Sequence, residues 1–387
     1  MDLATRVSDI TPSLTLAIDS KAKALRAEGV DIFGFGAGEP DFDTPEHIKK
    51  AAIEALNAGF TKYTPSSGTP ELRTAISEKF KRDNGLDYKP SEIIVSNGAK
   101  QSCFNAILAL CGEGDEVIIP APYWLSYPEM VRLAGAEPVI VQTTQANDWK
   151  ITPEQFEEAM SPRTKMIIIN SPGNPTGSVY TREELRALVE VAADEEIMIL
   201  SDEIYESLTY DGAEHVSVAS ITPEARDLTI TVNGFSKAYA MTGWRIGYLG
   251  APEQIAKAID SLQSHSTSGP CSFAQKGALA ALTSDQQCVA DMREEFNIRR
   301  EYIFERLSAI PGVTAVKPKG AFYILANISK LGMTSTNFAD RLLSKAKVAV
   351  VPGIAFGDDS VVRFSYATGL DVIKPGLDAF EEFCKSL

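Results

Sequence analysis

Seven short apolar runs between residues 93 and 249 constrain the fold of this chain more than any other feature. They occupy residues 93–95, 117–119, 139–141, 166–169, 197–200, 228–232 and 246–249, and turn-forming residues bound them. Because these runs are continuous and do not alternate strictly with polar residues, they predict strands that are covered on both faces. A sheet of this kind needs helices on each of its two sides.

Helical segments separate many of these runs. Residues 181–193 form one of them, and Thr181 and Glu184 have the spacing of a capping box at its start. Strands that alternate with helices predict a mostly parallel, seven-stranded α/β sheet. In such sheets ligands bind beyond the carboxyl ends of the strands, so the residues that follow the runs are the candidates for a site.

The pattern changes after residue 280. Residues 284–307 are typical of a long charged helix, and short apolar segments follow at 321–325, 348–351 and 361–365, with a helix between the first two. We therefore expect a large domain at residues 36–280 and a smaller α+β domain at residues 281–387. The N-terminal residues 1–35 are assigned to the smaller domain.

Composition argues against several classes of function. The 387 residues carry a formal net charge of -15 and no long basic run, which argues against binding to nucleic acid. The five cysteines and three histidines lack paired or metal-ligand spacing, so neither a disulfide framework nor a metal site is expected. The sequence shows no apolar leader and no run of membrane-spanning length, and we expect a cytoplasmic protein.

Polar residues with complementary chemistry follow three of the runs. Asn174 lies in a loop that prolines and glycines make rigid, Asp202 and Tyr205 follow residues 197–200, and Lys237 and Arg245 follow residues 228–232. A lysine amine can form an imine, and an arginine can hold a phosphate. An acid at the end of a buried strand needs a cationic partner, such as a protonated ring nitrogen, unless it caps a helix.

A strand-to-helix turn follows the first run. There the small residues Gly98 and Ala99, just before Lys100, would let backbone N–H groups approach an anion at the start of the helix. Taken singly, each of these features is as well explained by a turn, a cap or a surface charge. Their joint position after strands of one sheet favours a common site for a cofactor that carries a phosphate and forms an imine.

These residues and several further motifs resemble the class I aminotransferases, which are pyridoxal-phosphate enzymes of fold type I. The resemblance covers nearly the whole chain, and residues 122–130 and 240–247 resemble especially the bacterial and plant-plastid branch of aspartate aminotransferases, some of which also use prephenate. The motifs occur in the family's order: Gly38-Glu-Pro-Asp41, Lys62-Tyr63-Thr-Pro65, Asn174-Pro-Thr-Gly177, Ser201-Asp-Glu-Ile-Tyr205, Ser236-Lys237, Gly243-Trp-Arg245 and Arg363-Phe-Ser365.

The resemblance implies roles in binding the cofactor, pyridoxal 5'-phosphate. Lys237 would bind it covalently and then move the proton between the substrate's α-carbon and the cofactor. Asp202 would pair with the ring nitrogen, which keeps the ring an electron sink. Tyr205 and Asn174 would hydrogen-bond the ring oxygen, and Trp124 would stack on the ring face. The phosphate would be bound by Arg245, Ser236 and the backbone of Gly98, Ala99 and Lys100.

The resemblance also implies how substrate and partner subunit are bound. Arg363 would clamp the substrate α-carboxylate with a two-pronged bond, next to the backbone of Gly38 and the side chains of Trp124 and Asn174. Tyr63 in this family reaches the phosphate of the neighbouring subunit, so a homodimer is implied. Amino acids and 2-oxo acids would be the substrates, and no metal is implied.

Two departures from the family's pattern bear on the site. Many relatives have Ser or Thr three residues before the lysine, where this chain has Gly234, so Ser236 is the candidate replacement as a phosphate ligand. Animal-type aspartate aminotransferases bind the distal carboxylate with a second arginine, from a segment that matches residues 264–268, and this segment contains no arginine. In the branch that the chain resembles, a lysine like Lys100 can take that role.

The leading hypothesis is an aspartate aminotransferase that converts L-aspartate and 2-oxoglutarate to oxaloacetate and L-glutamate. One alternative keeps the mechanism and uses prephenate or an aromatic 2-oxo acid as acceptor. Another keeps the cofactor and carries out β-elimination or decarboxylation. A DNA-binding sensor is disfavoured by the acidic charge. A nicotinamide enzyme is disfavoured because residues 39–45 follow the glycines at 34–38 where a helix should begin.

Overall fold

A seven-stranded sheet forms the centre of the larger part of the molecule. The structure is a computed structural model that describes residues 4–8 and 10–387. The strand order is β2-β8-β7-β6-β5-β3-β4, and each of the seven predicted runs forms one of these strands. The strands are β2 (Ile93–Ser96), β3 (Glu116–Ala121), β4 (Glu137–Gln142), β5 (Thr164–Asn170), β6 (Met198–Asp202), β7 (Thr229–Gly234) and β8 (Gly247–Gly250).

The sheet is parallel except at β8, which pairs antiparallel with β2 and with β7. The register places Asn170 of β5 opposite Asp202 of β6, and Asp202 opposite Val232 of β7. The carboxyl ends of these three strands therefore meet at one edge of the sheet. The prediction of a mostly parallel sheet of seven strands is confirmed.

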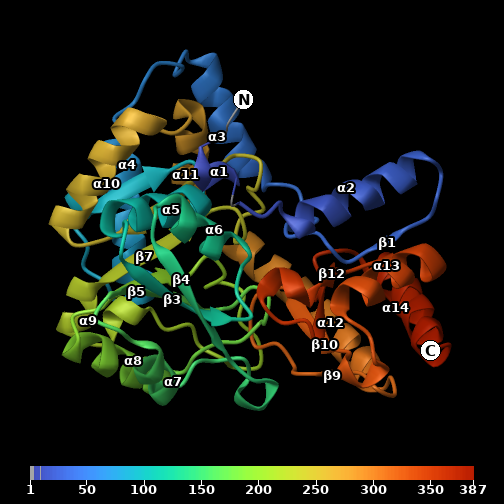
Figure 1. The fold of residues 1–387 in the computed structure, drawn as a ribbon. Helices are drawn as coiled ribbons and strands as arrows, with labels where there is room; N and C mark the ends of the chain where they lie inside the picture. Colours follow the sequence, from blue (N-terminus) through green and yellow to red (C-terminus); the bar gives the residue numbers. More distant parts are fainter. Residues whose placement is uncertain (1–3, 9) are drawn as a thin grey trace.

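Helices cover both faces of this sheet, which explains why its strands are continuously apolar (Figure 1). In β5, Met166 and Ile168 pack in one buried cluster with helices α5, α6 and α10, whereas Ile167 and Ile169 pack in another with α7, α8 and α9. These helices are α5 (Ala99–Leu110), α6 (Ser126–Leu133), α7 (Pro153–Ala159), α8 (Arg182–Asp194), α9 (Pro223–Leu228) and α10 (Glu253–Ser266). A third cluster packs β2 and β8 against α3 (Glu46–Asn57), α4 (Pro70–Lys79) and α11 (Ser272–Thr283).

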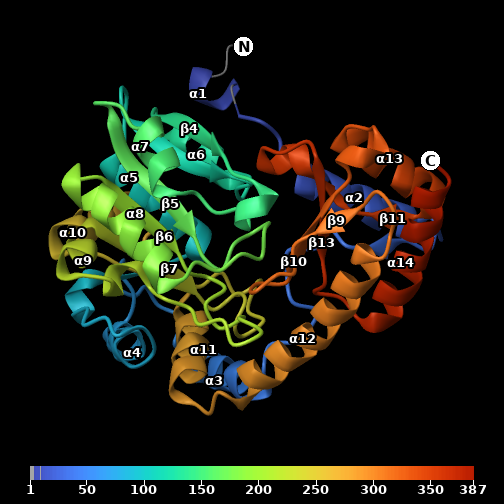
Figure 2. The ribbon, with the colours of Figure 1, turned by 90° about the horizontal axis from the view of Figure 1, so that it is seen from below.

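A smaller α+β part follows, as predicted. Its four-stranded antiparallel sheet has the order β12-β13-β10-β9 and packs with three helices (Figure 2). Its elements are β9 (Thr314–Ala315), β10 (Tyr323–Asn327), β11 (Val348–Ala349), β12 (Val351–Pro352), β13 (Val361–Ser365), α12 (Gln287–Ser308), α13 (Ser335–Ala346) and α14 (Leu370–Lys385). Short helices elsewhere are η1 (Phe80–Asn84, a π-helix), η2 (Pro90–Glu92), η3 (Gln145–Asn147), η4 (Val218–Ser220), η5 (Ser329–Leu331) and η6 (Gly353–Phe356).

The N-terminal segment contacts both parts. Strand β1 (Phe33–Gly34) pairs in parallel with β11, and residues of α2 (Leu14–Ala27) share a small apolar cluster with α13 and β11. Helix α1 (Thr5–Ser8) lies near α6, where the Thr11 N–H donates to Glu129 at 3.3 Å. Residues 1–3 and 9 lie outside the described residues, and the division after residues 35 and 280 stays a prediction.

Among the helices that the structure describes, none combines the length and the apolar character needed to cross a membrane.

The predicted capping box at the start of α8 is confirmed. Thr181 accepts the Glu184 N–H at 3.2 Å, and Glu184 accepts the Thr181 N–H at 2.8 Å. We expect Thr181→Ala to lower the free energy of unfolding by about 1 kcal/mol, because one N–H of the first turn loses its acceptor. Urea denaturation followed by circular dichroism measures the change. Thr181→Ser keeps the acceptor and should match the wild type; an equal loss in both variants would contradict this role of the hydroxyl.

Candidate active site

A cavity of about 540 Å³ lies at the carboxyl edge of the large sheet. Its lining combines residues from that sheet with Tyr323 and Arg363 from the smaller one, a place where α/β proteins commonly bind ligands. The sequence-predicted site residues in its lining are Gly38, Ala99, Lys100, Trp124, Asn174, Asp202, Tyr205, Ser236, Lys237, Arg245 and Arg363. Gly98 lies directly behind Arg245, and Tyr63 is 99% exposed and lies apart from this cavity.

Lys237 follows β7 and enters the cavity. Its Nζ donates to the carbonyl of Gly38 at 2.5 Å and makes no ion pair with a described residue. Burial lowers the pKa of Lys237 to about 8, and Arg245 and Arg363 add to the effect, while Glu39 and Asp202 oppose it. The neutral, nucleophilic form of this amine is therefore far more populated near neutral pH than that of an ordinary lysine.

Asp202 is the last residue of β6, and its carboxylate is buried. Oδ2 accepts the Tyr127 hydroxyl at 2.7 Å and faces the Cys103 thiol at 3.9 Å, and Oδ1 accepts the Ile204 N–H at 3.2 Å. Burial raises the pKa of Asp202, although the bonds from Tyr127 and Ile204 lower it. All three partners are neutral, so the carboxylate lacks a cation in direct contact among the described residues.

Arg363 is a buried cation that lacks an anion, the reverse of the situation of Asp202. Its side chain comes from β13 and is 2% exposed; Nη1 donates to Asn174 Oδ1 at 3.0 Å and Nη2 to the Gly36 carbonyl at 2.9 Å. Its Nε is buried without a partner, and among the described residues it makes no ion pair. Its guanidinium lies 4.4 Å from the ring centre of Tyr323, whose hydroxyl is 2.9 Å from that of Tyr205. A buried arginine without an anion is costly, so this site calls for an anionic ligand.

The start of α5 provides a cradle for a second anion. Gly98 precedes the helix at a φ of 86° and offers no side-chain cap, which leaves the first N–H groups available. A Cβ on Gly98 would collide with the guanidinium of Arg245, so the glycine allows the arginine to approach the backbone closely. Arg245 itself has a φ of 55°, and its Nη1 donates to the Thr242 carbonyl at 2.9 Å.

Gly234, the departure from the family's pattern, lies in β7 behind the cavity. It is not part of the cavity lining, whereas Ser236 is. A Cβ on Gly234 would lie 3.1 Å from Cα of Gly247 and 3.1 Å from Cδ1 of Ile204, which is tighter than ordinary packing. The close pairing of β7 with β8 accounts for the glycine, and Ser236 stays the candidate phosphate ligand.

The sequence left several lining residues unrecognised. Tyr323 comes from the smaller sheet, and Asn170 and Tyr127 hold the loops around Asn174 and Asp202. Tyr127 lies within the quoted motif at 122–130, so the resemblance could have found it. The other lining residues that were missed and carry a charge or a polar group are Ser13, Thr15, Lys23, Glu39, Ser126 and Thr242. Thr15 Oγ1 is buried without a hydrogen-bond partner.

Comparison with known proteins decides the family. The model of "Aminotransferase class I and II" matches residues 30–374. The chain belongs to this family. It is 52% identical to the aspartate aminotransferase of Geobacillus stearothermophilus and 48% identical to the aspartate/prephenate aminotransferase of Cereibacter sphaeroides, in both cases over at least 99% of each protein. The structure of aspartate aminotransferase from Thermus thermophilus with maleate superposes with a TM-score of 0.95, at 47% identity over 99% of each chain.

The aminotransferases of this family use pyridoxal phosphate, and the residues of this cavity fit that cofactor. The start of α5 and Arg245 suit a phosphate, and Asp202 is a buried acid that a protonated ring nitrogen would pair with. Lys237 is an amine of lowered pKa within the same cavity. The chain is therefore a transaminase of fold type I, with the large sheet and the smaller α+β part that its structural relatives share.

The lowered pKa of Lys237 leads to a prediction about the protein freed of cofactor. Its amine should react with pyridoxal, which lacks the phosphate, at a rate that rises with pH through about 8, because only the neutral amine is a nucleophile. Borohydride reduction and peptide mass spectrometry would measure the label on Lys237. An exposed lysine such as Lys257 provides the internal control, and a midpoint near the ordinary lysine value of 10.5 at both positions would contradict the prediction.

Proposed function

We propose that this aminotransferase transfers the amino group of L-aspartate to 2-oxoglutarate, giving oxaloacetate and L-glutamate. The buried guanidinium of Arg363, which makes no ion pair with a described residue, carries the proposal, because a carboxylate is the ligand that matches its two-pronged geometry. The names of the relatives support aspartate as substrate, and the Thermus structure with maleate supports a dicarboxylate.

The charges around the cavity also favour dicarboxylates. Its lining contains five cationic side chains, Lys23, Lys100, Lys237, Arg245 and Arg363, and two carboxylates, Glu39 and Asp202. The cations exceed the carboxylates by three, an excess that a phosphate and two substrate carboxylates can offset. Water screens the exposed cations Lys23, Lys100 and Arg245 more than it screens the buried Arg363, so Arg363 should attract an anion most strongly.

Each residue would have a separate part in the mechanism. Arg363 and the Gly38 backbone would hold the α-carboxylate and so turn the Cα–H bond toward Lys237. Pyridoxal phosphate, when bound, supplies the electron sink for the charge left on the α-carbon. The Lys237 amine would take the proton from the α-carbon of the donor and move it to the cofactor, and it would supply a proton to the α-carbon of the acceptor. Asp202 would hold a proton on the ring nitrogen, and Tyr205 would donate to the ring oxygen.

Lys100 is our candidate for the distal carboxylate. It is the second residue of α5, its Nζ lies 4.8 Å from the ring centre of Trp124, and it makes no ion pair with a described residue. Burial and the nearby Arg245 lower its pKa. An anionic ligand bound beside Lys100 would stabilise its charged form and offset this effect. Lys100 would thus take the place of the arginine that residues 264–268 lack.

A half-reaction titration tests the function. Aspartate and glutamate should convert the cofactor of the purified enzyme to its amine form, seen as a loss of the absorbance of the lysine-bound cofactor; an unchanged spectrum would refute the proposal. Lys100→Ala should lower kcat/KM for aspartate roughly tenfold to a hundredfold, and the value for phenylalanine much less, because one charged hydrogen bond is lost. Arg363→Lys is the control that should impair both substrates, and equal losses in Lys100→Ala would exclude Lys100 from distal recognition.

Prephenate or an aromatic 2-oxo acid is the alternative acceptor. The aspartate/prephenate name of a relative that is 48% identical over nearly the full length favours it. Rates measured with oxaloacetate and with prephenate on the amine form of the cofactor distinguish the two specificities. Pyruvate or ammonia released without any acceptor would instead support the lyase alternative.

We further propose a homodimer in which Tyr63 completes the neighbouring site. Tyr63 is 99% exposed, and α3 in the preceding segment exposes Ile53 and Leu56 at 56% and 48%. A tyrosine and two aliphatic residues on one exposed stretch suit an interface between subunits. A cytoplasmic location, which the sequence led us to expect, stays a prediction.

Mixed dimers test the placement of Tyr63. Tyr63→Phe and Lys237→Ala should each lower activity, and the two proteins unfolded and refolded together should regain activity. A mixed dimer then contains one complete site, made by Lys237 of one subunit and Tyr63 of the other. Refolding each variant alone is the control. If mixing restores nothing although mixed dimers form, Tyr63 does not act in the partner's site.

A further inference from the structure

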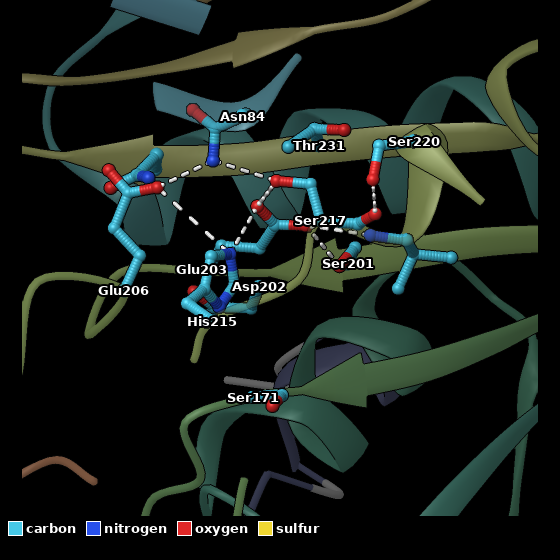
Figure 3. A network of polar contacts seen from close by, with 12 residues as sticks. Asn84, Ser171, Ser201, Asp202, Glu203, Glu206, His215, Ser217, Ser220 and Thr231 are labelled. Atoms are coloured by element: carbon cyan, nitrogen blue, oxygen red, sulfur yellow. Dashed lines mark hydrogen bonds and ion pairs between the residues drawn. The ribbon is translucent and has the colours of Figure 1, made fainter. Parts of the chain in front are cut away.

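The turn that follows β6 has two functional faces. Asp202 and Tyr205 line the active-site cavity. Glu203 and Glu206, each the next residue, do not line it and belong to a buried polar network (Figure 3). Within residues 202–206, two residues that line the cavity therefore alternate with two that belong to the network. Any movement of the network side must move the cofactor side, because the same short stretch of backbone carries both.

Glu203 anchors the network. Its side chain is 1% exposed and accepts four hydrogen bonds. Oε1 accepts the Ser201 hydroxyl at 2.9 Å and the Val218 N–H at 3.3 Å, and Oε2 accepts His215 Nε2 at 2.9 Å and the Ser217 hydroxyl at 2.6 Å. A carboxylate offers about four acceptor positions, so Glu203 has no capacity left over. Its geometry is fixed by groups before and after it in the chain.

Glu206 ties the same turn to a distant segment. It pairs with Lys79 at the end of α4 and accepts from Asn84 Nδ2 at 2.8 Å, and Asn84 also donates to the Ser217 hydroxyl at 2.7 Å. Lys79 directly precedes the π-helix η1 and Asn84 is its last residue, so this helix sets the direction of Asn84. Three segments thus converge on the back of the cofactor turn: residues 79–84, 203–206 and 215–217.

The ligand atoms of Glu203, Glu206 and His215 lie within 4.8 Å of one another, a spacing that could suit a metal ion. The charges favour a different account. Lys79 already neutralises Glu206, and burial lowers the pKa of His215 less than the charge and hydrogen bond of Glu203 and the charge of Glu206 raise it. Both carboxylates already have their donors, so a hydrogen-bonded network accounts for the cluster.

We propose that Glu203 and His215 are positioning residues, which hold the turn after β6 so that Asp202 and Tyr205 meet the cofactor in the right orientation. Neither residue touches the cavity, and each acts through the backbone that it shares with or ties to that turn. The inference rests on the proposed cofactor contacts of Asp202 and Tyr205. It goes beyond them, because it attributes the orientation of Asp202 and Tyr205 to groups that lie outside the cavity, behind the turn.

His215 offers a matched pair of variants. Its Nδ1 is buried without a partner, so Nε2 provides its interaction with Glu203. His215→Gln places an amide nitrogen near the position of Nε2 and keeps the donor, whereas His215→Leu removes it. Ser217→Ala removes the second donor to Oε2 of Glu203, and it provides the same test if His215→Leu does not fold. Ser335→Ala, which removes a buried hydroxyl bonded to Asp359 in the smaller part, controls for general loss of stability.

The experiment measures two properties of the cofactor. Apoprotein titrated with pyridoxal phosphate gives its Kd, and absorbance against pH gives the midpoint at which the lysine-bound cofactor loses its proton. In His215→Leu or Ser217→Ala we expect a Kd raised about tenfold, a typical effect of losing an outer-shell partner. We also expect the midpoint to move to higher pH, because a displaced Tyr205 no longer stabilises the negative ring oxygen.

The outcomes separate the two proposals. His215→Gln should restore most of the wild-type Kd and midpoint, and Ser335→Ala should leave both unchanged even if it melts at a lower temperature. A wild-type Kd and midpoint in both His215→Leu and Ser217→Ala would overturn the positioning role, as would equal defects in Ser335→Ala. A wild-type enzyme that binds the cofactor but does not react with amino acids would instead refute the proposed function.

Discussion

The structure depends on one constraint: two charged side chains, Arg363 and Asp202, are buried without an ion-pair partner among the described residues. Arg363 is almost fully enclosed and has hydrogen bonds only to neutral oxygens, while Asp202 accepts only from neutral donors. Charges of this kind cost free energy in a folded protein unless a partner arrives. The rest of the fold holds them in one cavity, where an anionic substrate and a cationic ring nitrogen would satisfy both.

Two layers of structure keep these groups in place. The first is the large sheet, whose paired registers bring Asn170, Asp202 and the end of β7 to one edge. The second lies behind that edge, where Glu203 and its four donors fix the turn from the side away from the cavity. A sheet alone sets the position of a strand end, but not the direction of the side chains in the turn after it. The buried network supplies that direction.

The sequence was sufficient to predict the strands and helices and the site residues at the strand ends. It was insufficient to predict contacts between segments that are distant in the chain. Continuous apolar runs predict covered strands, and the polar residues after them predict one edge, so Asp202, Tyr205 and Lys237 could be found. Tyr323 could not, because its hydroxyl meets that of Tyr205 only after two sheets have packed together. The network around Glu203 was hidden for a similar reason, since residues 79–84 and 215–217 meet it from distant positions.

The contrast between the cavity and the whole chain bears on specificity. The protein carries a net charge of -15, yet cations outnumber carboxylates in the lining of the cavity by five to two. An acidic surface repels anions, so an anionic substrate is attracted only where it reaches the positive lining of the cavity. A monocarboxylate would pair with Arg363 and leave Lys100 without a counter-charge, whereas a dicarboxylate would provide a counter-charge for both side chains. Loss of solvation and the neighbouring Arg245 lower the pKa of Lys100, and a carboxylate bound beside it would offset both effects.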